Sequence, residues 1–314
     1  MVSNKLKGYL LAALAAAAYG TNPAFAVPLY EQGMNPNSVL LFRYILGLPF
    51  LFLMLVIRKI PFGLRKVEIF PVIVLGVLMA ISSLTLFESY QYMNSGVAST
   101  LLFIYPILVA VIMIFFFHEQ FKISLVICLC FMCLGLFLLM KSDGDNPISG
   151  YGCLLVMISA LTYALYIVFV NVSKVVSQIP TTKLLFYVLF FGSFVFLFSA
   201  AIGTDITLPS KNTGWCNLLA LSLIPTVLSL ACTSAAIHVI GSTSTAIFGA
   251  LEPVTAVILS LVILNQSITL REIIGGFFIV IATTIVVADK SVDKIILSVR
   301  KMFPKNLLRK TNKE

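Results

Sequence analysis

Charged residues and long polar segments are scarce in this sequence. Only 11% of its 314 residues are Asp, Glu, Lys or Arg, whereas 60% are hydrophobic and the mean hydropathy is +1.06. A soluble domain usually has about a quarter of its residues charged, so this chain has too little polar surface to cover a water-soluble globule. The composition therefore excludes a soluble globular fold and indicates a protein whose solvent is the lipid bilayer.

Residues that support catalysis or metal binding are equally few. The chain has two histidines, His118 and His238, both expected at helix ends, and it has no phosphate loop or nucleophile elbow. Cys128, Cys130 and Cys133 are spaced like a metal cluster, but nothing nearby supplies a fourth ligand. We therefore interpret the cysteines as buried free thiols that pack as small hydrophobes. We expect no enzyme activity, no cofactor and no metal site.

Ten hydrophobic stretches follow one another along the chain, and each is long enough to cross a hydrocarbon core of about 30 Å as a helix. We therefore expect an all-α membrane protein with ten transmembrane helices. The first stretch is apolar over a full spanning length, so we interpret it as a retained helix and not as a cleaved signal peptide. The expected spans are 6–29, 37–57, 69–91, 96–117, 123–140, 150–172, 184–203, 215–237, 242–264 and 272–288.

The positions of Lys and Arg predict the orientation of these spans. With the amino end inside, 17 of the 21 basic residues lie in inside loops or in the tail, and Arg43 lies within a span. The outside loops contain Lys141, Lys211 and Arg271. We expect a multi-pass protein of the cell inner membrane with both termini cytoplasmic. The basic tail, 290–314, should lie on the anionic inner leaflet, with regulatory docking as the alternative, so the net charge of +9 requires no nucleic-acid partner.

The second five spans echo the first five. Tyr19 lies 144 positions before Tyr163, and Pro106 lies 147 positions before Pro253. Further pairs at the same two spacings are Pro36 with Pro180, and Ser95 with Ser242. Because each half has an odd number of spans, the two halves must run in opposite directions through the bilayer. This inverted repeat is a common architecture of secondary transporters.

At these positions the chain resembles the EamA-domain family of the drug/metabolite transporter superfamily. The resemblance is carried by the Tyr19-Gly20 step, the short turns between the third and fourth spans of each half, and the paired prolines. It implies a ten-helix carrier made of two inverted five-helix repeats, 1–141 and 142–289, which moves metabolites across the inner membrane, often outward. The family pattern ends the fourth helix of each half with Gly-Glu. Here His118-Glu119 and Asn265-Gln266 take that place, so we expect those positions to be structural.

Glu252 is the leading candidate for a functional side chain. It lies near the middle of the ninth span, directly before Pro253, which removes one backbone hydrogen bond from the helix. An ionisable residue at that depth is costly and by default marks a pathway or a partner. The carboxyl could carry a proton or bind a substrate ammonium group. The alternative is a protonated side chain that only packs between helices.

Other polar contacts are expected at the same depth. Tyr105 is adjacent to Pro106, the repeat mate of Pro253. The alternative is that the proline only kinks the helix and has no functional role. Asn22, before Pro23, can satisfy freed backbone groups or line a cavity. By the resemblance, a midplane cavity would be lined by helices one, three, four, six, eight and nine. We predict substrate contacts from Asn22, Tyr105, Tyr163 and Glu252, with aromatic walls from Tyr19 and Phe248.

A separate prediction concerns Arg43 and Glu88, two ionisable residues within the spans. Both lie in the outer third of their spans, so an ion pair between two adjacent helices is expected, with an outer gate as the alternative.

Together these features predict a secondary transporter of a small amino-acid-like or related amphipathic metabolite, working by alternating access, with export favoured over uptake. Its expected partners are a small-molecule substrate, the lipid bilayer and, if Glu252 titrates, protons. A monomer and a homodimer fit equally well. The alternative class is a membrane scaffold or signalling protein, which would need no polar residue beside a helix break at repeat-related positions.

Overall fold

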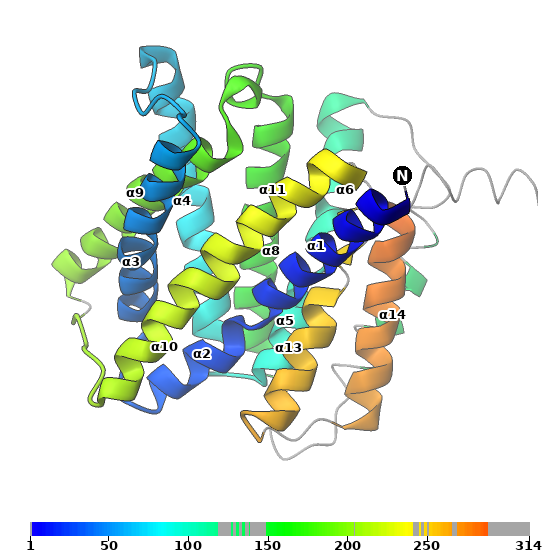
Figure 1. Ribbon diagram of the computed structural model, residues 1–314. Helices are drawn as coiled ribbons and strands as arrows, with labels where there is room; N and C mark the ends of the chain where they lie inside the picture. The colour runs from blue at the N-terminus through cyan, green and yellow to red at the C-terminus, as the bar shows by residue number, and fades with distance from the viewer. Residues whose placement is uncertain are drawn as a thin grey trace, which may run out of the picture.

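The computed structural model describes residues 2–118, 149–203, 205–240, 251–265 and 269–287, with a few single positions between these ranges. The described residues are helical, joined by short turns (Figure 1). The helices are α1 (Val2–Gly20), α2 (Asn22–Tyr30), α3 (Pro36–Ile57), α4 (Lys66–Ser89), α5 (Ser95–Leu102), α6 (Tyr105–Phe117), α8 (Gly150–Val172), η1 (Val176–Gln178), α9 (Thr181–Ile202), α10 (Asn212–Ser222), η2 (Leu223–Leu228), α11 (Ser229–Ile240), α13 (Leu251–Val262) and α14 (Leu270–Val287).

Seven helical segments of the described residues are long and apolar enough to cross a membrane, and a shorter apolar helix covers Leu251–Val262. Their bounds agree with the predicted spans one to four and six to eight. The predicted fifth span, 123–140, and the basic tail lie almost entirely outside the described residues. The seven segments are Lys5–Tyr30, Pro36–Ile57, Lys66–Ser89, Ser95–Phe117, Gly150–Val172, Thr181–Ile202 and Asn212–Thr233.

The outer surface of the helices is apolar. Phe70, Phe115, Phe116 and Ile202 each expose more than 70% of their surface. Burying such side chains in water-excluded surroundings is favourable, and a bilayer supplies those surroundings without a protein partner. The all-helical fold also satisfies the backbone hydrogen bonds that lipid cannot.

The first span is broken where proline interrupts it. Pro23, in the first turn of α2, has no N–H to donate to the carbonyl of Tyr19. The side chain of Asn22 donates to that carbonyl instead, at 2.8 Å, and the hydroxyl of Thr21 donates to the carbonyl of Ala18 at 2.6 Å. The break is therefore satisfied locally, and α2 continues the first span beyond it (Figure 1).

The predicted fourth span is broken in the same way. The helix is interrupted at Phe103 and Ile104 and resumes as α6, with Pro106 in its first turn. The short turn before α5 is closed by Asn94, whose side chain accepts a hydrogen bond from the backbone N–H of Gly96 at 2.9 Å.

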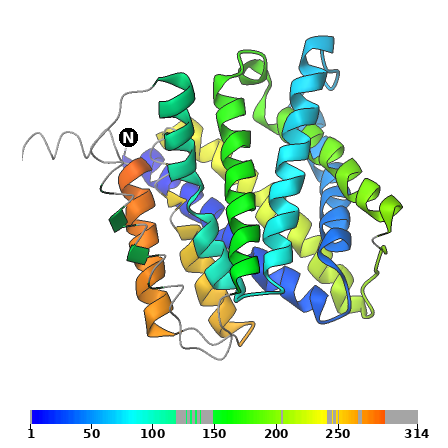
Figure 2. The same cartoon turned by 180° about the vertical axis from the view of Figure 1, so that it is seen from behind.

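Two helices occupy corresponding positions on opposite sides of the molecule. On the side seen in Figure 1, α1 packs between α11 and α13. On the other side, seen in Figure 2, α8 packs between α4 and α6. At one edge of the molecule, on the left in Figure 1, α3 packs along α9.

The approach of α1 to α13 depends on Gly20. A Cβ atom at this position would lie 2.5 Å from the backbone oxygen of Glu252 and 2.8 Å from Cβ of Thr255. Only a residue without a side chain fits at this crossing, so the last turn of α1 lies directly on the first turn of α13.

Candidate functional site

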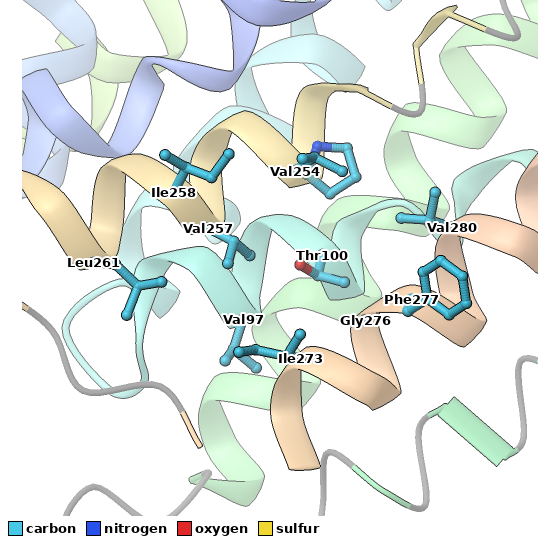
Figure 3. Close-up of a pocket in the computed structure, with 11 residues that line it drawn as sticks. Val97, Thr100, Val254, Val257, Ile258, Leu261, Ile273, Gly276, Phe277 and Val280 are labelled. Carbon is cyan, nitrogen blue, oxygen red and sulfur yellow. The ribbon is translucent and has the colours of Figure 1, made fainter. Parts of the chain in front are cut away.

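Two cavities in the described residues differ in chemistry. The first, of about 430 Å³, lies between α5, α13 and α14 and is drawn in Figure 3. Its wall is almost wholly aliphatic, with Val97, Val257 and Ile273 around the hydroxyl of Thr100. That hydroxyl already donates to the carbonyl of Gly96 at 2.9 Å. This apolar pocket therefore offers nothing with which to recognise a polar solute.

The second cavity, of about 270 Å³, lies between helices of both halves and has polar as well as apolar groups on its wall. Helices α1, α3, α4, α8, α9, η2 and α11 all contribute to it, so both halves of the sequence form its wall. The residues that line this central cavity are Tyr19, Arg43, Tyr44, Met79, Ser83, Tyr163, Tyr166, Leu185, Leu189, Pro225, Thr226, Ser229, Leu230 and Thr233.

Several hydroxyls of this wall are already hydrogen-bonded to other protein groups. The hydroxyls of Tyr44 and Ser83 lie 2.9 Å apart and bond α3 to α4. Ser229 donates to the carbonyl of Ala15 at 2.9 Å, which joins α11 to α1, and Thr233 donates to the carbonyl of Ser229 at 2.9 Å. These groups are satisfied by protein and set the shape of the cavity.

Three tyrosine hydroxyls of the wall have no hydrogen-bond partner among the described residues: those of Tyr19, Tyr163 and Tyr166. The ring of Tyr163 stacks on that of Tyr166, with centroids 6.0 Å apart, and meets the ring of Tyr105 edge-on at 4.7 Å. Aromatic packing of this kind fixes ring positions. The cavity thus offers ordered aromatic faces with hydroxyl groups available to a ligand.

Arg43 is the charged residue of the wall. It is only 6% exposed, its Nε donates to the hydroxyl of Thr226 at 3.1 Å, and its guanidinium carbon lies 5.4 Å from the centroid of the Phe87 ring. The backbone carbonyl of Arg43 also accepts a hydrogen bond from Ser222 at 3.0 Å. The ion pair predicted between Arg43 and Glu88 is not formed, so that prediction is wrong. The guanidinium turns instead toward Thr226 and the aromatic ring.

Thr226 reaches Arg43 because the helix is irregular at this point. Residues Leu223–Leu228 form a π-helical turn, within which Pro225 has no N–H to donate. The hydroxyl of Thr226 donates to the carbonyl of Leu221 at 3.3 Å, five residues back, as a widened turn allows. Single π-turns inside helices occur frequently at functional sites.

Two of the predicted residues line the central cavity: Tyr163, expected to contact the substrate, and Tyr19, expected to form an aromatic wall. Tyr105 is not among the residues that line the cavity, but its ring packs against that of Tyr163. Asn22 is 4% exposed; its amide group satisfies the broken backbone of the first span, while its side-chain oxygen has no partner in the described residues.

Glu252 and Phe248, both predicted to contact or enclose the substrate, are not among the described residues that line the central cavity. Glu252 is half-buried in the first turn of α13, and its carboxyl is within electrostatic range of Tyr19, Tyr105 and Tyr163. No described residue forms an ion pair with it. Phe248 stacks on Tyr9, with centroids 5.6 Å apart, and is not among the residues that line the central cavity. The side chain of His238 lies outside the described residues.

Sequence reasoning missed Arg43, Thr226 and the Tyr44–Ser83 pair as cavity residues. A signal for Thr226 was present, because Pro225 interrupts the predicted eighth span as Pro23 interrupts the first. No comparable sequence signal indicates the direction in which the side chain of Arg43 points.

Comparisons with known proteins agree with this fold. The model of the EamA-like transporter family matches residues 6–141 and 150–288. A curated protein of Bacillus subtilis (strain 168), described as an uncharacterized transporter, YdfC, is 23% identical over 247 residues, which are 78% of this chain and 79% of that protein. A solved crystal structure, described only as that of a protein, is similar with a TM-score of 0.62 and 16% identity, over 90% of this chain and 98% of the other. The chain belongs to the EamA-like transporter family and is a multi-pass membrane transporter.

Proposed function

We propose that this protein is a secondary transporter of the inner membrane, which moves a small amino-acid-like or related amphipathic metabolite by alternating access, normally outward. The observation that carries the proposal is the central cavity. It has polar and aromatic groups available to a solute, and repeat-related residues, Tyr19 and Tyr163, stand on its wall. A scaffold or signalling protein has no need of such a cavity between its halves.

The proposed architecture is ten helices in two inverted repeats, 1–141 and 142–289, with both termini cytoplasmic. This architecture is supported by the helix contacts, which occur in pairs related by exchanging the first half of the chain with the second. The third span packs along the sixth, as α4 on α8, and the eighth packs along the first, as α11 on α1. Exchanging the two halves turns one contact into the other, as an internal two-fold relationship requires.

Contacts at the two ends of the molecule follow the same exchange (Figure 1). At one end the backbone N–H of Asn35, before α3, donates to the hydroxyl of Thr207, before α10, at 2.9 Å. At the other end Arg65, before α4, donates to the side chain of Gln178, before α9, at 3.2 Å. Two halves joined at both ends around a central cavity suit a carrier in which the ends open in turn.

Glu252 is the proposed coupling residue. A half-buried carboxyl within electrostatic range of the cavity tyrosines is able to bind and release a proton as the surroundings change, which would couple export to the proton gradient. The half-buried position of Glu252 and its lack of an ion-pair partner among the described residues support this role.

Solute counterflow with the full chain in proteoliposomes tests the proposal. Vesicles preloaded with unlabelled amino acids or related amphipathic compounds should take up the labelled compound transiently, and protein-free vesicles should not. A protein that reconstitutes in folded form and moves no solute under any imposed solute or pH gradient would leave the scaffold class as the better account.

A further inference from the structure

The central cavity contains a permanent positive charge that the described residues do not neutralise. The guanidinium of an arginine stays protonated at every physiological pH. Arg43 is 6% exposed, and the ion pairs of the described residues include no carboxylate partner for it. Glu88 and Glu252 are both present in the surrounding helices, yet neither pairs with it. A buried charge without a counter-ion is costly, so this position calls for an anion from outside the protein.

The guanidinium is also held in a defined position. One of its five N–H groups, Nε–H, donates to Thr226, and the Phe87 ring lies beside its carbon at 5.4 Å. The hydroxyl of Thr226 is itself fixed by the carbonyl of Leu221. The remaining N–H groups have no partner among the described residues, although the side chain lines the cavity. A planar pair of free N–H groups matches a carboxylate, which accepts two parallel hydrogen bonds.

We propose that the transported solute carries a carboxylate group and that Arg43 binds this group in the central cavity. This inference rests on the proposed function and adds to it a substrate class: small organic monocarboxylates, zwitterionic ones included.

A carboxylate fits better than a more highly charged anion for two reasons. A single guanidinium balances one negative charge, and the described residues of the wall contribute no second cation, so a phosphate dianion would leave a net charge in a poorly solvated cavity. The cavity, of about 270 Å³, is also small, and its remaining free groups are the rings and hydroxyls of Tyr19, Tyr163 and Tyr166. These suit the uncharged part of a small amphipathic acid.

Solutes that share a carbon skeleton but differ in charge test the role of the carboxylate group. Binding and counterflow are measured with the full chain for monocarboxylates from acetate to benzoate, for zwitterionic amino acids, and for the amides and amines of the same skeletons. Four proteins are compared: wild type, Arg43→Gln, Arg43→Lys and Arg58→Gln. Arg58 follows α3 and donates to the hydroxyl of Thr182 at 3.2 Å, away from the central cavity, so its variant controls for loss of one arginine.

The proposal expects wild type and Arg58→Gln to prefer at least one carboxylate over its amide by about 10-fold or more, as charge-assisted hydrogen bonds allow. Arg43→Gln should lose that preference while still binding the amide, which also reports that the variant is folded. Arg43→Lys should keep a preference for the anion but bind it more weakly, because a point charge replaces the planar fork.

Three results would overturn the proposal. Equal carboxylate preference in wild type and Arg43→Gln would remove Arg43 from the site. A wild-type protein that moves amides or amines but no carboxylate would refute the substrate class and leave the transporter proposal standing. Failure of folded wild type to bind or move any solute of the panel would refute both.

Discussion

Ser82 and Ser159 exchange hydrogen bonds across the contact between α4 and α8. The hydroxyl of Ser82 donates to the carbonyl of Ser159 at 3.0 Å, and the hydroxyl of Ser159 donates to the carbonyl of Ser82 at 2.7 Å. The related contact on the other side of the molecule joins Ser229 to the carbonyl of Ala15. Ser229 lies 147 positions after Ser82 and Ser159 lies 144 after Ala15, the same two spacings that relate the halves of the sequence.

Substituting Ser82 by Ala should lower the free energy of unfolding by about 0.6 to 1.7 kcal/mol, the range found for hydrogen bonds between membrane helices. The measurement is unfolding of the purified protein by SDS in mixed micelles. Thr162→Ala is the control, because the hydroxyl of Thr162 bonds only carbonyls of its own helix. If both variants lose the same stability, the hydrogen bonds between α4 and α8 contribute nothing specific.

Gly20→Ala should destabilise the protein by about 1 to 3 kcal/mol, the usual cost of overpacking. Its Cβ would lie 2.5 Å from the backbone oxygen of Glu252, which cannot move without shifting α13. Gly150→Ala is the control, since nothing lies within 4 Å of the added atom. Thermal unfolding followed by the fluorescence of Trp215 compares the two, and equal midpoints would contradict the close contact of α1 with α13.

Tyr163→Phe should weaken solute binding by about 2- to 10-fold, the worth of one hydrogen bond, and leave stability unchanged. The hydroxyl is lost, but the ring that packs between Tyr105 and Tyr166 is kept. Tyr151→Phe serves as the control on the same helix, because Tyr151 is 53% exposed and does not line the cavity. Unchanged affinity in counterflow would remove the Tyr163 hydroxyl from the site.

Glu252→Gln should abolish transport driven by a pH gradient and spare counterflow at equal pH on both sides. Glutamine keeps the size of the side chain but cannot release a proton. Glu88→Gln is the control, a half-buried acid outside the residues that line the cavity. A Glu252→Gln variant with full rate and full pH dependence would exclude proton coupling through this residue.

The helices were predictable because hydropathy is a local property. The described spans one to four and six to eight begin and end within a few residues of the predicted ones. The pairing of Tyr19 with Tyr163 was also visible at a fixed spacing, and both line the cavity.

The partner of Arg43 was not predictable from its depth. Depth matching identified Glu88, but the helix face on which each side chain stands depends on how α3, α4 and α10 pack together. The contact with Thr226 also requires the π-helical turn at Leu223–Leu228. Hydropathy does not distinguish a π-helical turn from an ordinary α-helical one. Phe248 illustrates the same limit: its span was expected to line the cavity, and its ring lies on Tyr9 instead.

Access to Leu230 tests alternating access most directly. Leu230 lines the central cavity and lies 147 positions after Ser83, which lines it too. In a chain whose six cysteines are replaced, Leu230→Cys should react with a membrane-impermeant maleimide added from either side of the bilayer, and a transported solute should slow both reactions. Leu228→Cys, on an exposed apolar surface outside the cavity lining, should stay unlabelled. Labelling of Leu230→Cys from one side only, with no protection by any transported solute, would contradict a carrier that opens its central cavity to each side in turn.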